Sequence, residues 1–254
     1  MTTQDLVRIE DLRVKLFTDG ADKAQILDMA QKPWIKGFTT NPSLLRKAGV
    51  TDYEAYGREL VAAVPDRHIS FEVFSDDIPE MIAQARLITT WGKNVYVKLP
   101  VSTTRGEMLY DAVRDLSRDG VKVNVTAIFT EEQALTTIEA LAGAAPACVS
   151  VFAGRLGDLG IDYRPIMQAA VARARRTANA EIIWASTREV FNVVEAHDMK
   201  CHIITAPADV LKKLPALGSK TSAELSLDAV KAFREDALAA GLSLDLSASS
   251  RAAE

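Results

Sequence analysis

The 254-residue sequence has few of the residues that build disulfide frameworks or metal sites. Its two cysteines, Cys148 and Cys201, each lie within an apolar run, and such sparse usage argues against a disulfide-stabilised secreted fold. The three histidines, His68, His197 and His202, lie too far apart in sequence for a recognisable metal-binding motif. We therefore expect a protein of the reducing cytoplasm, and no metal site is indicated.

Long apolar runs and an excess of positive charge are also missing. No stretch approaches the roughly 18 uninterrupted apolar residues of a membrane-spanning helix, and the N-terminal segment lacks the apolar core of a signal peptide. The formal net charge is -4 and the pI is near 5.5, which argues against a nucleic acid or an anionic membrane as the main partner. The remaining composition, with 48% hydrophobic and 25% charged residues, is typical of a globular protein with a large core.

Short apolar segments alternate with longer amphipathic stretches along the chain. The apolar segments are rich in Val, Ile or Phe, as buried parallel strands are, and they cover residues 12–19, 34–40, 68–74, 94–100, 121–129, 147–154, 181–187 and 201–207. Helical periodicity is clearest over residues 77–92, 105–120 and 131–143. In the second range Met108, Leu109, Val113 and Leu116 share one face. Thr130 precedes the third range as a predicted N-cap.

This alternation predicts a (β/α)8 barrel. A doubly wound open sheet is the structural alternative, but the segment after the first strand, TDGADKAQ, is not a Gly-rich phosphate loop. Because no repeat, low-complexity tract or linker divides the chain, we predict one barrel domain over residues 1–254. An additional amphipathic helix at about 222–239 is expected to cover the barrel or to contact another subunit in a homo-oligomer. Residues from about 243 to 254 are predicted to form a flexible tail.

The most informative residues are polar side chains at the ends of the predicted strands. Catalytic groups of such barrels project from the C-terminal strand ends, and here these ends carry Asp19, Asn41, Glu72, Lys98, Asn124 with Thr126, Ser150 and Ser186. Each residue alone has an ordinary explanation in helix capping, turn formation or core packing. Together, at seven strand ends, they predict a functional site.

Lys98 is the most specific of these residues because it lies within the apolar segment NVYVKLP. A lysine there could extend its stem outward and keep its ammonium in water. If it is buried instead, burial favours the neutral amine, which can attack a carbonyl carbon. Arg155 and Arg188 follow the sixth and seventh strands, and the guanidinium group suits a phosphate, although solvation or helix capping would also explain each of them.

Five segments, in order, resemble the transaldolase family over residues 12–207. They are KGFTTNPSLLRKAG, VYVKLPVSTTRGE, VNVTAIFTEEQA, CVSVFAGRLGD and WASTREV. The resemblance implies a Schiff base on Lys98, acid–base roles for Glu72 and Asp19, and a catalytic water oriented by Thr126. It also implies that Asn41 and Asn124 hold substrate hydroxyls, that Ser150 supports the pocket, and that Arg155, Ser186 and Arg188 bind phosphate. Neither a metal nor an organic cofactor is implied.

The related fructose-6-phosphate aldolases typically have Gln at the position of Glu72 and Tyr at the position of Phe152. At both positions this sequence resembles the transaldolases instead. The resemblance places Phe152 in the substrate pocket. The implied reaction moves a dihydroxyacetone unit from a ketose phosphate, fructose 6-phosphate or sedoheptulose 7-phosphate, to an aldose phosphate in the pentose phosphate pathway. Three alternatives remain open. They are an aldolase that releases dihydroxyacetone, an enzyme for a modified sugar in a specialised pathway, and a catalytically silent sugar-phosphate-binding barrel.

Overall fold

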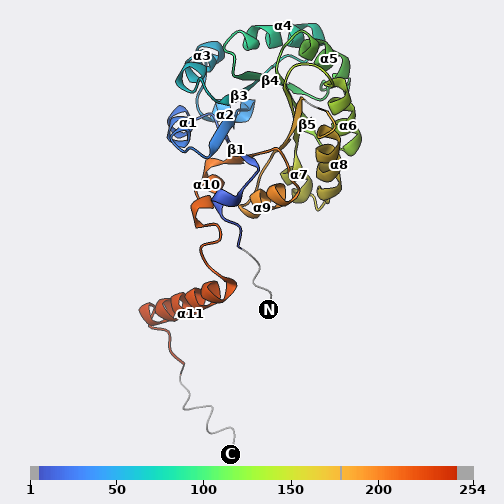
Figure 1. The fold of residues 1–254 in the computed structure, drawn as a ribbon. Coiled ribbons are helices and arrows are strands. Elements are labelled where there is room, and N and C mark those ends of the chain that lie inside the picture. The colour runs from blue at the N-terminus through green and yellow to red at the C-terminus, as the bar shows by residue number, and fades with distance from the viewer. Residues whose placement is uncertain (1–5, 178, 245–254) are drawn as a thin grey trace, which may run out of the picture. The chain divides into compact units, whose positions relative to one another are not determined.

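A computed structural model describes residues 6–177 and 179–244. Its parallel strands form a closed barrel in which β8 pairs back with β1 (Figure 1). The strands are β1 (Lys15–Asp19), β2 (Ile35–Thr39), β3 (His68–Glu72), β4 (Val95–Pro100), β5 (Val123–Ile128), β6 (Ala147–Val151), β7 (Ala180–Trp184) and β8 (Ile203–Pro207). The predicted (β/α)8 barrel is confirmed, and the open-sheet alternative is wrong because the first and last strands are paired.

Helices surround the barrel strands as an outer ring (Figure 1). The helices that follow the strands are α1 (Lys23–Ala30), α2 (Pro42–Lys47), α3 (Tyr53–Ala63), α4 (Ile78–Thr89), α5 (Tyr110–Arg118), α6 (Glu131–Ala140), α7 (Ala153–Asp158), α8 (Arg164–Ala174), α9 (Phe191–Asp198) and α10 (Ala208–Leu211). Side-chain caps fix several starts. Thr130 is the N-cap of α6, as predicted, and forms a capping box with Gln133. Asp77 caps α4 by accepting a hydrogen bond from the Glu80 backbone.

The predicted helix over 105–120 begins later than expected, at Tyr110. Residues before it form a turn in which Gly106 has a φ of +82° and the hydroxyl of Thr103 accepts hydrogen bonds from two backbone N–H groups. Met108 pairs with Ser102 in an isolated antiparallel bridge and is exposed. The placement of Met108 on the buried helix face was therefore wrong, because local turn hydrogen bonds outcompete the helical periodicity.

Large apolar side chains fill the barrel and the layer between its strands and helices. Phe17, Phe38, Phe71, Leu99 and Trp184 are each at most 2% exposed, and burying a side chain of this size contributes about 1.5–3 kcal/mol. Because side chains pack the interior, it is not a pore, and any substrate site must lie at the ends of the strands.

The chain divides into two units, residues 11–214 with the barrel and residues 1–10 with 215–254. The second unit contains α11 (Ser222–Ala239), which begins at a capping box of Thr221 and Glu224 and has no buried residue. Its contact with the barrel or with another subunit remains a prediction, and residues 245–254 of the predicted tail lie outside the described residues. Among the described helices, none combines the length and apolarity that crossing a membrane requires.

Candidate active site

Strand register brings the central charged residues together. Glu72 of β3 pairs with Lys98 of β4, which in turn pairs with Asn124 of β5. In the adjoining part of the sheet, where β2 pairs with β3, Asp19 of β1 pairs with Thr39 of β2. Parallel strands carry all of these side chains to the same end of the barrel, so residues far apart in sequence form one cluster.

The Lys98 ammonium is buried and makes two polar contacts. Its side chain is 8% exposed, and its Nζ lies 3.1 Å from Oε2 of Glu72 and donates a hydrogen bond of 2.8 Å to the Thr40 carbonyl oxygen. The alternative of an outward-extended, solvated lysine is therefore wrong. A buried amine with a carboxylate in contact has a direct acceptor for its proton, which is the arrangement that a lysine nucleophile needs.

Asp19 lines the same cavity as Lys98, and its environment suits it to accept a proton. Burial raises the pKa of Asp19, while Lys98 and a hydrogen bond from Thr39 oppose that rise. A carboxylate with a raised pKa holds a proton more tightly, so it is a stronger base than an exposed aspartate. Asp19 is not a helix cap, because Asp22 caps α1.

The hydroxyl groups of Thr39 and Thr205 form a hydrogen-bonded chain that ends at Asp19. Thr39 donates to Asp19 Oδ1 at 2.8 Å and lies 2.6 Å from the hydroxyl of Thr205. Since the single hydroxyl proton of Thr39 points to Asp19, Thr205 must be the donor in the second bond. Thr205 also lines the cavity, although the sequence offered no sign of this beyond its place near the end of the eighth strand.

A cavity of about 410 Å³ lies above this cluster. Ten of the eleven predicted site residues line it: Asp19, Asn41, Glu72, Lys98, Thr126, Ser150, Phe152, Arg155, Ser186 and Arg188. Asn41 also caps α2, its Oδ1 accepting from the Leu44 backbone at 3.0 Å, so it has a structural role in addition to lining the cavity. Within the described ranges, no three His, Cys, Asp or Glu side chains are placed to hold a metal ion together.

Asn124 is the predicted site residue that the cavity does not include. Its side chain is fully buried beneath the cavity. Its amide nitrogen donates to Ser70 at 3.1 Å, and its oxygen accepts from Ser150 at 2.7 Å. In this arrangement Asn124 orients the hydroxyl of Ser150, and direct contact with a substrate hydroxyl remains a prediction.

Backbone irregularity shapes the wall next to Lys98. The β5–β6 register shifts between Val125 and Ile128, and Ala127 has a φ of +59°, which is rare for a residue with a side chain. The Thr126 hydroxyl beside it is buried, lines the cavity and has no hydrogen-bond partner among the described residues. This hydroxyl is therefore free to bind a water molecule or a substrate oxygen.

The residues predicted to bind phosphate come from two neighbouring segments at the cavity rim. Arg155 lies on α7, and its guanidinium carbon is 4.9 Å from the centre of the Phe152 ring. Ser186, with a φ of +65°, and Arg188 follow β7. The segments approach so closely that a Cβ on Gly154 would lie 1.6 Å from the Ser186 carbonyl oxygen. Only glycine fits at position 154, a requirement that the sequence did not reveal.

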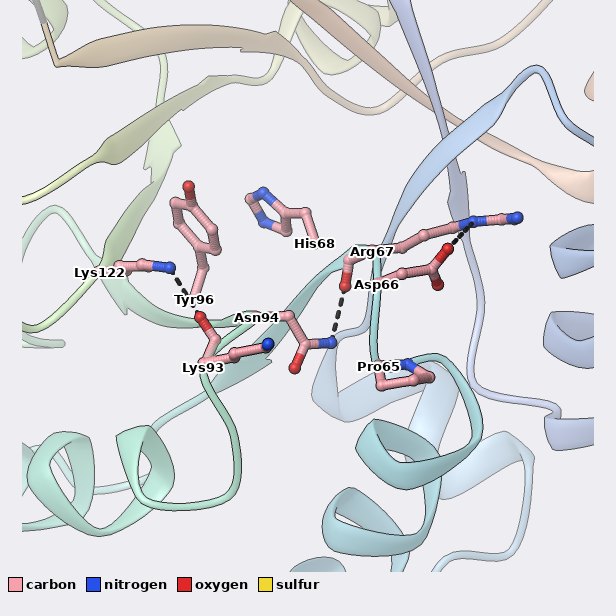
Figure 2. Close-up of a pocket in the computed structure, with 8 residues that line it drawn as sticks. All are labelled: Pro65, Asp66, Arg67, His68, Lys93, Asn94, Tyr96 and Lys122. Atoms are coloured by element: carbon pink, nitrogen blue, oxygen red, sulfur yellow. Dashed lines mark hydrogen bonds and ion pairs between the residues drawn. The ribbon is translucent and has the colours of Figure 1, made fainter.

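A second cavity, of about 630 Å³, lies at the opposite, N-terminal end of the strands (Figure 2). It is lined by residues that precede or begin β3, β4 and β5, including His68, Lys93, Tyr96 and Lys122. Figure 2 shows the His68 and Tyr96 rings face to face, with centroids 3.7 Å apart. Burial lowers the pKa of His68 to about 3, so this imidazole is neutral near pH 7. None of the predicted site residues lies here, and the smaller cavity is the candidate active site.

Comparison with known proteins identifies the family and agrees with the barrel fold. Residues 16–254 match the family model described as Transaldolase/Fructose-6-phosphate aldolase. The chain therefore belongs to the transaldolase/fructose-6-phosphate aldolase family, and it is an enzyme of the transaldolase type.

Similar proteins include a probable transaldolase from Thermoanaerobacter sp., 37% identical over 91% of this chain and 100% of that protein. A probable transaldolase from Methanococcus maripaludis is 38% identical over 79% of this chain and 89% of its own length. Among solved structures, deoxyribose phosphate aldolase from Aeropyrum pernix matches with a TM-score of 0.56 at 13% identity. That match covers 84% of this chain and 94% of the solved chain, and it shows a shared fold.

Proposed function

We propose that this enzyme transfers a dihydroxyacetone unit from a ketose phosphate to an aldose phosphate through a Schiff base on Lys98. The observation that carries the proposal is the buried Lys98 ammonium, 3.1 Å from the Glu72 carboxylate at the floor of a cavity rimmed by arginines. Fructose 6-phosphate and sedoheptulose 7-phosphate are the donors we expect, in the pentose phosphate pathway.

The covalent step begins when Lys98 gives its proton to Glu72 and its free amine attacks the ketone carbon of the donor. Loss of the carbonyl oxygen as water, with a proton returned by Glu72, leaves an iminium ion. The Thr126 hydroxyl has no partner among the described residues, and we assign it to hold a water molecule that carries protons between Glu72 and the reacting oxygen.

Cleavage then uses the iminium ion as an acceptor of electrons. Asp19 removes the proton from the hydroxyl on the carbon beyond the bond that breaks, and the aldose product leaves. The three-carbon enamine stays bound to Lys98 until an acceptor aldehyde restores a carbon–carbon bond, and water finally releases the new ketose. Six further predicted site residues line the cavity; we assign Asn41, Ser150 and Phe152 to the three-carbon unit, and Arg155, Ser186 and Arg188 to the phosphate.

Borohydride trapping tests the covalent step directly. Reduction in the presence of fructose 6-phosphate should convert the iminium ion into a stable amine, and peptide mass mapping should find the three-carbon adduct on Lys98 alone. Binding of the sugar phosphate without any adduct would contradict the proposal and support a silent binding barrel.

Arg188→Ala should discriminate between phosphorylated and unphosphorylated acceptors. A hydrogen bond from a charged donor contributes about 1.5–3 kcal/mol, so we expect kcat/KM for glyceraldehyde 3-phosphate to fall roughly 10- to 150-fold. The value for glyceraldehyde should change little, because it offers no phosphate to the guanidinium group. Steady-state kinetics with both acceptors checks this.

Arg164→Ala is the matched control for that experiment. Arg164 is also exposed and paired with an aspartate, Asp162, but it does not line the cavity. An equal loss for both acceptors in Arg188→Ala would show that Arg188 supports the barrel rim instead of binding phosphate.

Transfer of the dihydroxyacetone unit to an aldose phosphate should be much faster than release of free dihydroxyacetone. Phe152 carries no hydroxyl that could help to protonate the bound enamine, and its ring is instead packed against Phe129 and Arg155. Two rates are compared at saturating donor: release of dihydroxyacetone without an acceptor, and formation of the transfer product with an acceptor. We expect release to be at least about tenfold slower, which corresponds to about 1.4 kcal/mol in the barrier. Equal rates would identify a dihydroxyacetone-releasing aldolase.

A further inference from the structure

Arg188 is held at both ends by residues outside the cavity lining. Its Nε lies 3.0 Å from each carboxylate oxygen of Asp158, and its Nη2 donates to Asp158 Oδ2 at 2.6 Å. Asp158 ends α7, the helix that also carries Arg155. The Arg188 side chain is therefore clamped by a carboxylate from the neighbouring strand–helix unit.

The backbone of Arg188 is fixed by a separate set of hydrogen bonds. Its N–H donates to Oδ1 of Asn192 at 3.0 Å, and Asn192 in turn donates to Glu195 at 3.0 Å. Tyr163 donates to both carboxylate oxygens of Glu195, at 3.0 and 2.9 Å. With its backbone anchored in this way, the orientation of the guanidinium plane depends on Asp158.

The hydrogen-bond count leaves Arg188 able to bind a second anion. A guanidinium group has five N–H donors in a fixed plane, and Asp158 occupies the Nε edge. Both N–H groups of Nη1 and the second N–H of Nη2 remain, and Arg188 lines the cavity whereas Asp158 does not. The ion pair also lowers the pKa of the Asp158 carboxyl, so the clamp stays charged well below neutral pH.

Arg155 offers a contrast within the same rim. Its guanidinium carbon lies over the Phe152 ring. The Arg155 charge helps to lower the pKa of Asp158, but among the described residues Arg155 makes no direct ion pair with a carboxylate like that of Arg188. The rim therefore combines Arg188, which a carboxylate holds directly, with Arg155, which packs on an aromatic ring.

We propose that Asp158 is a positioning residue that orients Arg188 for a substrate phosphate and so determines preference for phosphorylated acceptors. This inference rests on the proposed function, because it assigns Arg188 the phosphate role. Asp158 does not touch the substrate. It acts by keeping the free edge of the Arg188 fork turned into the cavity.

Asp158→Asn removes the charge with little change in side-chain size. We expect the KM for glyceraldehyde 3-phosphate to rise roughly 5- to 20-fold, less than for loss of the arginine itself, because the guanidinium group remains but is no longer oriented. We expect kcat, and the KM for glyceraldehyde, to stay within about twofold. Asp158→Glu, which keeps the carboxylate, should recover part of the loss.

A double-mutant cycle shows whether Asp158 works through Arg188. In the Arg188→Ala background, Asp158→Asn should have no further effect on the phosphorylated acceptor. Asp162→Asn is the matched control, because Asp162 makes a similar two-pronged pair with Arg164 without reaching the cavity, and its kinetics should equal those of the wild type. Thermal unfolding of each variant confirms that the barrel is intact.

The outcomes separate this inference from the function on which it rests. If Arg188→Ala discriminates between the acceptors while Asp158→Asn does not, the positioning role is overturned and the phosphate role stands. A lower KM in Asp158→Asn would also overturn it, since the carboxylate would then be a competitor of the phosphate. If Arg188→Ala does not discriminate at all, the phosphate role itself fails.

Discussion

Lys98→Arg should abolish turnover while leaving the fold intact. The guanidinium group keeps the positive charge next to Glu72 but stays protonated and cannot form an imine. We expect kcat/KM to fall by on the order of 10⁴-fold or more, as is typical for loss of a covalent nucleophile. Coupled-enzyme kinetics and borohydride trapping should both report the loss.

The fold of that variant needs its own measurement, because Lys98 is buried in the barrel. Far-UV circular dichroism and thermal unfolding should match the wild type within a few degrees, and Lys98→Met gives a second, uncharged variant of similar length. Lys122→Arg, at the opposite end of the barrel, should keep full activity. Residual turnover in Lys98→Arg, or an adduct on another lysine, would refute the assignment.

Gly154→Ala should damage both the site and the stability of the barrel. Its Cβ would lie 1.6 Å from the carbonyl oxygen of Ser186 and 2.7 Å from its carbonyl carbon, which are backbone atoms that cannot rotate away. The segment that carries Ser186 and Arg188 must therefore shift relative to α7. We expect the free energy of unfolding to fall by about 1–3 kcal/mol, and kcat/KM for phosphorylated acceptors to fall roughly 100-fold.

Gly157→Ala provides a control in the same helix. A Cβ there would meet the Tyr163 ring at 3.3 Å, a contact that a small side-chain movement relieves, so activity should be nearly unchanged. Denaturant unfolding and kinetics on both variants make the comparison. Wild-type stability and KM in Gly154→Ala would show that the close approach of the two segments does not matter.

Much of the architecture follows from local sequence pattern. Eight Val-, Ile- and Phe-rich segments match the eight observed strands, and Thr130 with Gln133 marks a helix start. The prediction over 105–120 was wrong at its beginning, because apolar spacing alone cannot show that Thr103 and Gly106 close a turn. Periodicity reports which residues can share a face, whereas turn hydrogen bonds decide where a helix begins.

The strand-end residues could be predicted because parallel strands share a direction. Once the barrel is inferred, Asp19, Glu72 and Lys98 must lie at one end of it. The family resemblance added roles for these residues, and those roles remain proposals. Sequence spacing did not show that the Asn124 side chain would be hydrogen-bonded to Ser70 and Ser150. These contacts depend on which strands of the barrel lie close to one another.

Sequence pattern was enough to predict the barrel, the end of it that bears the polar cluster, and Lys98 as its most specific residue. Tertiary structure decided that Glu72 contacts that lysine, that Thr205 supports Asp19 through Thr39, and that Asp158 clamps Arg188. It also decided that position 154 must be glycine. The difference lies in how far apart in the sequence the interacting residues are. Strand and helix periodicity is written within a few neighbouring residues, whereas a hydrogen bond or a steric limit between two segments depends on how the closed barrel places them side by side.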